Sequence, residues 1–127
     1  MTSPQGVWRG RFRYDVGLAA VIHWLFNFKH DHDFILDLQC DGSLVIGETK
    51  ERSEFSLLGG EYRKRASVEG QWDVERQTLT FVKIYAKPIG LVHMPIHYEG
   101  RLEGQRLSGR WWIQTSTGTW SAERQAG

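Results

Sequence analysis

Residues 62–72 read YRKRASVEGQW, and apolar or small residues fall mainly on the even-numbered positions. The odd-numbered positions of this stretch are all polar. Side chains of an extended chain point alternately to opposite faces, so a period of two residues is typical of a half-buried strand and not of a helix. The stretch therefore predicts a β-strand with one face against a core and the other in solvent.

A five-residue pattern within this stretch, Val68-x-Gly70-x-Trp72, recurs along the chain. Its other occurrences are Trp8-x-Gly10-x-Phe12, Val45-x-Gly47-x-Thr49, Tyr98-x-Gly100-x-Leu102 and Leu107-x-Gly109-x-Trp111. The alternation puts each glycine on the same inner face as its large neighbours. A missing side chain on that face lets a sheet bend sharply, so the repetition predicts a sheet coiled tightly enough to close on itself.

Extending this reading to the whole chain predicts eight strands. They are expected at 7–14, 33–39, 44–51, 62–72, 78–86, 95–102, 106–115 and 118–125. Turn-forming residues separate several of them, at 40–43, 73–77 and 103–105. Eight antiparallel strands linked by hairpins predict an all-β, up-and-down barrel, with a β-sandwich as the alternative.

Composition restricts the class of protein further. A chain of 127 residues fits a single β-barrel domain over 1–127, and its one cysteine, Cys40, cannot form an intrachain disulfide. The chain begins without a basic and apolar leader, so a cytoplasmic location is expected. The formal net charge is +1, with basic residues spread along the chain, and the longest apolar stretch is too short for a membrane span. No nucleic-acid partner, membrane association or cofactor is therefore expected.

Two apolar segments depart from the strand pattern. Residues 17–28 place apolar side chains at helical spacing, which indicates a short amphipathic helix or an extended strand. Residues 86–95 are apolar but bracketed by prolines, which favours a loop. Both are expected to lie over the mouth of the barrel, where a ligand would enter.

The two ends of the chain resemble calycins, the superfamily of lipocalins, fatty-acid-binding proteins and avidins. Gly6-Val7-Trp8 matches the G-x-W of their first strand, and Arg124 lies near the end of the last predicted strand. Residues 109–124 look particularly like the last two strands of avidins. The resemblance implies a lipocalin- or avidin-like barrel in which Arg124 packs across Trp8 and closes one end.

The first functional hypothesis is that the barrel lumen binds one small apolar molecule. Aromatic residues on the expected inner face, together with one from the segment 17–28, are the candidate ligand contacts: Phe12, Tyr14, Trp24, Trp72, Phe81, Tyr98 and Trp111. A ligand-free structural or interaction module is an alternative. The enzyme alternative is a cofactor-independent cyclase or isomerase acting on a hydrophobic substrate in the same lumen, with candidate proton-transfer residues Lys83, Tyr85, His97 and Tyr98.

The orientation of the strand 78–86 decides between several of these roles. Both of its faces are apolar at the centre, so the pattern leaves the inward set open. An inward Lys83 and Tyr85 would put a cation and a phenol in the lumen, suited to anchoring a carboxylate or to proton transfer. The favoured interpretation is that Lys83 points outward over its aliphatic stem.

A metal or haem site formed by histidines is a weaker alternative to these functions. His30 and His32, with Asp31 and Asp33 beside them, and the pair His93 and His97 provide only pairs of ligands, so no metal site is predicted and 29–33 is interpreted as a solvated loop. A haem ligand, His93 or His23, is the remaining alternative of this kind.

Trp112 is expected to face outward beside an inward Trp111. It is either part of a homo-dimer interface or a solitary surface aromatic.

Overall fold

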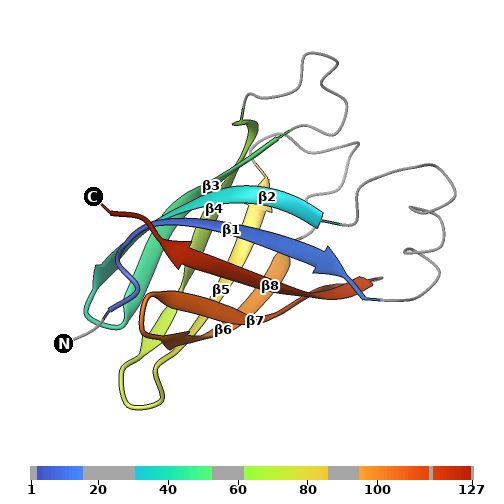
Figure 1. Cartoon of the computed structure of the whole chain (residues 1–127). Coiled ribbons are helices and arrows are strands. Elements are labelled where there is room, and N and C mark those ends of the chain that lie inside the picture. The colour runs from blue at the N-terminus through green and yellow to red at the C-terminus, as the bar shows by residue number, and fades with distance from the viewer. Residues whose placement is uncertain (1–2, 16–30, 53–61, 86–94, 115, 127) are drawn as a thin grey trace, which may run out of the picture.

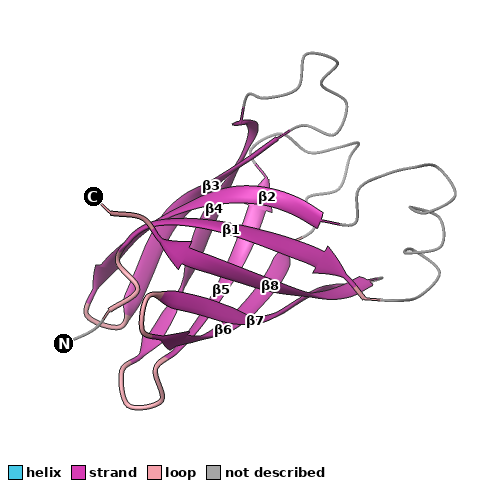
Figure 2. Ribbon diagram, viewed as in Figure 1, coloured by secondary structure: helices cyan, strands magenta, loops and turns pink. Residues whose placement is uncertain are grey.

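The computed structural model describes residues 3–15, 31–52, 62–85, 95–114 and 116–126, and the regular elements among them are all strands (Figure 2). In chain order these are β1 (Gly6–Tyr14), β2 (Asp31–Asp41), β3 (Leu44–Arg52), β4 (Tyr62–Asp73), β5 (Thr78–Tyr85), β6 (Ile96–Glu103), β7 (Arg106–Ile113) and β8 (Ser116–Arg124). Each strand pairs antiparallel with the next, and β8 pairs with β1 to close an eight-stranded barrel (Figure 1). The all-β, up-and-down barrel prediction is confirmed, and the sandwich alternative is wrong.

The predicted strand bounds differ from the observed ones mainly in β2. This strand begins at Asp31, so Asp31 to Asp33 belong to the sheet and not to the solvated loop expected there. It also continues through Cys40 and Asp41, which leaves only Gly42 and Ser43 in the turn before β3. Gly42 has a φ of 62°, the left-handed conformation that a two-residue hairpin requires.

Glycines on the inner face allow neighbouring strands to approach closely. A Cβ atom added to Gly47 would lie 2.0 Å from the carbonyl oxygen of Asp37 on β2. Gly10 and Gly100 are similarly crowded, by β8 backbone and by the Trp120 ring. The recurring pattern therefore occurs where the strongly coiled sheet leaves no space for a side chain.

The two ends of the barrel differ in how the strands are joined. At one end, the hairpin end, tight turns connect β2 to β3 and β6 to β7, and residues 74–77 connect β4 to β5. At the other, the long-loop end, residues 15–30, 53–61, 86–95 and 114–115 join the strands. Most of these residues lie outside the described part of the chain, and the predictions for 17–28 and 86–94 fall there.

Side chains inside the barrel change in character from one end to the other. Near the hairpin end the interior is mostly aliphatic: Leu36, Leu38, Val45, Leu79, Leu102 and Leu107 are buried there beside Trp8 and Trp72. Aromatic rings follow toward the long-loop end: Phe12, Phe34, Phe81, Tyr98, Trp111 and Trp120. The buried polar side chains, Thr49, Glu51 and Lys83, lie in this half too, on β3 and β5. The long-loop half is therefore where the interior has chemistry beyond packing.

The hairpin end is covered by an arginine stacked on a tryptophan. The Arg124 guanidinium lies 4.5 Å from the centre of the fully buried Trp8 ring. It donates hydrogen bonds to Ser3 O at 2.7 Å, to Gln5 O and to Gln105 Oε1 at 2.6 Å. Trp8 Nε1 donates to Pro4 O at 2.8 Å. These contacts attach the N-terminal segment across the barrel end.

Substituting Arg124 should cost more than substituting an arginine that faces solvent. Arg124→Ala removes the stacked cation and leaves three acceptors without their donor, and we expect a loss of about 1–3 kcal/mol in the free energy of unfolding. Arg101→Ala, on the exposed outer face of β6, is the matched control and should change it by less than about 0.5 kcal/mol. Urea unfolding followed by tryptophan fluorescence measures both. Equal losses would show that Arg124 does not stabilise the barrel end.

Candidate functional site

Lys83 and Glu51 form an ion pair inside the barrel. Lys83 is 2% exposed and Glu51 3% exposed. Lys83 Nζ donates hydrogen bonds to Glu51 Oε1 at 3.1 Å and to Tyr98 OH at 2.9 Å. The Tyr85 hydroxyl donates to the same Glu51 oxygen at 3.2 Å. These four residues are the interior polar cluster.

Three different strands supply the cluster. Glu51 is on β3, Lys83 and Tyr85 are on β5, and Tyr98 is on β6. Since β4 lies between β3 and β5, the ion pair bridges two strands that are not neighbours. The register of β3 and β4 shifts between Glu51 and Arg52, an irregularity typical of positions where a sheet redirects a side chain.

Aromatic rings surround the ammonium group. Lys83 Nζ lies 4.9 Å from the centre of the Phe12 ring and 5.0 Å from those of Tyr85 and Tyr98. Tyr98 stacks on Phe81 with ring centres 4.8 Å apart. Trp111 meets Phe12 and Tyr14 edge to face. The cluster is thus a charged and hydrogen-bonded group beside a wall of aromatic rings.

The pKa values of Lys83, Tyr85 and Tyr98 keep these three side chains protonated at neutral pH. Burial acts to lower the pKa of Lys83, but the neighbouring Tyr98, Glu51 and Tyr85 outweigh it and hold that pKa above its usual range. Burial raises the pKa of the Tyr85 and Tyr98 hydroxyls, and the positive charge of Lys83 only partly offsets this. Lys83 is therefore an ammonium and both tyrosines are neutral phenols near pH 7.

These protonation states predict that the protein loses stability in alkaline solution. Unfolded tyrosine and lysine ionise near pH 10, whereas the buried groups keep their protons, so the folded state binds more protons and the free energy of unfolding falls as pH rises. Each group contributes up to about 1.4 kcal/mol per pH unit. The fall between pH 10 and 11, measured by urea unfolding, should be shallower in Tyr98→Phe. An identical slope in wild type and variant would contradict a buried, raised-pKa Tyr98.

The interpretation of Lys83 as an outward side chain is wrong. Leu79, Phe81 and Lys83 are buried on the inner face of β5, whereas Thr80 and Ile84 are exposed. Burying a lysine ammonium is costly unless a partner compensates the charge. Glu51 provides that partner, which is why Lys83 can occupy the lumen.

The structure brings most of the candidate ligand contacts together. Phe12, Tyr14, Phe81, Tyr98 and Trp111 surround the cluster or pack on one another beside it. Trp72 is buried but lies at the hairpin end of β4, away from the cluster. Trp24 lies outside the described residues.

His97 is not part of the cluster with Lys83 and Tyr98. It is on the outer side of β6 and stacks on Trp112, with ring centres 5.5 Å apart. Trp112 is 40% exposed. The two rings form a small aromatic surface on the outside of the barrel.

Two inward polar residues, Thr49 and Glu51, were not among the site residues predicted from the sequence. Thr49 ends one of the five-residue patterns, and extending the same alternation by two residues places Glu51 on the inner face. The alternation alone therefore predicts a carboxylate inside the barrel. Its partner, Lys83, is 32 residues away on a strand whose orientation the pattern left open.

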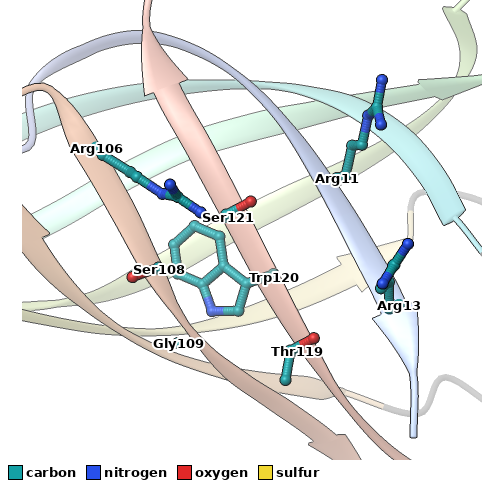
Figure 3. Close-up of a pocket in the computed structure, with 8 residues that line it drawn as sticks. All are labelled: Arg11, Arg13, Arg106, Ser108, Gly109, Thr119, Trp120 and Ser121. Carbon is teal, nitrogen blue, oxygen red and sulfur yellow. The ribbon is translucent and has the colours of Figure 1, made fainter.

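A second candidate lies on the outer surface. A hollow of about 510 Å³ is lined by Arg11, Arg13, Arg106, Ser108, Gly109, Thr119, Trp120 and Ser121. Figure 3 shows Arg106 on β7 directed toward Ser121 on β8, with Arg11 and Arg13 on β1 at the other side. Arg11 pairs with Asp33 at 3.3 Å, and both side chains are well exposed. Because its charged groups are solvated, this hollow is a weaker candidate than the buried cluster.

Metal ligands do not gather in the described part of the chain: no three His, Cys, Asp or Glu side chains there converge on one point. His23, His30 and His93 lie outside it, and for His32 only the backbone is described. The described residues include no helix long and apolar enough to cross a membrane.

Comparison with models of protein families, with curated proteins and with solved structures found no match to this chain.

Proposed function

We propose that this protein is a calycin-like barrel that binds one small, flat and largely apolar molecule in the long-loop half of its lumen. The observation that carries the proposal is the buried Lys83–Glu51 pair beside an aromatic wall. Replacing a buried ion pair by apolar side chains is often neutral or stabilising. A barrel selected only for stability would gain nothing from this pair, whereas a ligand site needs a few fixed polar groups among apolar ones.

The way the hairpin end is covered also favours a ligand site in the long-loop half of the lumen. Arg124, Trp8 and the N-terminal segment cover the hairpin end, and the cluster lies toward the opposite end. A ligand entering from the long-loop end would reach the half of the lumen that holds both the aromatic rings and the polar cluster.

The protonation states favour binding over the enzyme alternative. A general acid or base works best when its pKa lies near the working pH. The pKa values of Lys83, Tyr85 and Tyr98 are all raised above ranges that already lie well above neutral. Such groups hold and orient a ligand, but they exchange protons poorly near pH 7.

Nile red, a flat neutral dye that fluoresces in apolar surroundings, tests the proposal. Wild-type protein should bind it saturably with one dye per chain. Ala66 is buried on β4 between Thr49 and Tyr85, so Ala66→Phe should put a ring beside the cluster, where the ligand is proposed to bind, and weaken binding at least about tenfold. Ser67→Phe is the matched control, because Ser67 is the next residue and faces solvent.

Circular dichroism of both variants checks that the barrel is intact. If Ala66→Phe does not fold, Ala66→Leu adds less volume and serves in its place. Dye binding of equal strength in the wild type and in the Ala66 and Ser67 variants would place the dye outside the lumen and overturn the proposal.

A further inference from the structure

Two buried polar atoms at the base of the site have no partner among the described residues. They are Glu51 Oε2 and Thr49 Oγ1. Glu51 Oε1 accepts hydrogen bonds from Lys83 and Tyr85, whereas Oε2 of the same carboxylate accepts none from the described residues. The vacant oxygen is an acceptor inside the lumen.

Leaving such an acceptor without a donor is costly, because a buried charged oxygen has lost its water. Thr49 and Glu51 are two residues apart on the inner face of β3, so their side chains lie about 7 Å apart along one wall of the lumen. A bound molecule that donates a hydrogen bond at this wall would satisfy Glu51 Oε2, and a second polar atom on it could reach Thr49.

The charges at the cluster restrict the ligand group further. Lys83 already has a carboxylate partner, so a carboxylate ligand would bring a second negative charge against the vacant oxygen of Glu51. A cationic ligand would face the Lys83 ammonium at the same depth. A neutral N–H or O–H donor avoids both repulsions.

We infer that, provided the lumen is the binding site as proposed above, its ligand is a neutral hydrogen-bond donor such as an amide or alcohol, recognised by Glu51 Oε2 and Thr49, and that carboxylates are rejected. This specificity is the reverse of the carboxylate anchoring that a lumenal lysine and phenol suggest by themselves.

Three probes with one common ring system test the inference: 2-naphthamide, methyl 2-naphthoate and 2-naphthoate. The amide has N–H donors, the ester has none, and the acid is an anion at pH 7. Displacement of Nile red from wild-type protein should give the amide about tenfold tighter binding than the ester. The carboxylate should bind at least about tenfold more weakly than the amide.

Two variants test whether Thr49 Oγ1 and Glu51 Oε2 cause this order of probe affinities. Thr49→Val keeps the shape of the side chain and removes the hydroxyl oxygen that would accept the second N–H of the amide, which the ester lacks, so the preference for amide over ester should fall about threefold. Glu51→Gln removes the repulsive charge and leaves Lys83 without its counter-ion, so 2-naphthoate should gain at least about tenfold relative to the amide. If Glu51→Gln does not fold, Thr49→Val alone decides the role of this wall.

Each outcome has a distinct meaning. Absence of saturable binding by all three probes and by Nile red would overturn the proposed function, and the inference with it. Tight binding of 2-naphthoate by wild-type protein, or an amide preference unchanged in Thr49→Val, would leave lumenal binding in place and overturn the donor specificity.

Discussion

Substituting valine for Gly70 or Gly109 is expected to lower the free energy of unfolding by more than about 3 kcal/mol or to prevent folding altogether. A Cβ atom at Gly70 would lie 1.9 Å from Thr80 O, and one at Gly109 would lie 1.8 Å from Glu99 O. Both oxygens belong to the backbone of a paired strand. The clash can be relieved only by separating strands of the closed sheet, because no flexible side chain is available to move.

Gly104→Ala is the control for this series. Gly104 lies in the turn between β6 and β7, with a φ of 61° and no atom within 4 Å of an added Cβ. Gly104→Ala should therefore lower the free energy of unfolding only by the cost of an alanine in the left-handed backbone conformation, about 1–2 kcal/mol. Urea unfolding followed by tryptophan fluorescence measures all three variants. Equal losses at the three positions would mean that the sheet is not coiled as tightly as described.

Removing the cation of the buried pair is the second change with a large expected effect. Lys83→Met leaves Glu51 as a charged group in the barrel interior, and we expect a loss of about 3–5 kcal/mol in the free energy of unfolding. The double variant Lys83→Met with Glu51→Leu removes both charges and should recover most of this loss.

An exposed ion pair provides the matched control. Lys50 Nζ lies 3.7 Å from Glu48 Oε1, with both side chains well exposed. Lys50→Met should therefore cost less than about 1 kcal/mol. A Lys83→Met loss no larger than that of Lys50→Met, or a double variant less stable than the single one, would contradict a buried and mutually compensated pair.

The barrel could be predicted from sequence because its determinants are local. Alternation along residues 62–72 and the recurring glycine pattern identify strands and their inner faces without knowledge of their partners. Trp8, Trp72 and Trp111 are buried on the faces that the alternation assigns to the core. The error at Cys40 and Asp41 arose because turn-forming residue types can also continue a strand.

The interior polar cluster could not be predicted in the same way, because it depends on pairs far apart in sequence. Alternation on β5 is ambiguous, since Val82 and Ile84 are apolar on the outer face while Lys83 is charged on the inner one. Only the presence of Glu51 two strands away makes an inward Lys83 favourable. His97 shows the opposite case, because chemistry-bearing residue types also occur on faces that point away from the lumen.

The most direct test of lumenal binding is nuclear magnetic resonance of the protein with 2-naphthamide, measuring intermolecular Overhauser effects from the naphthyl protons. A ligand against the polar cluster predicts effects to the rings of Phe12 and Tyr98, both buried in the long-loop half. Effects confined to Trp112 and His97, the exposed stacked pair on the outer surface, would contradict a binding site inside the barrel.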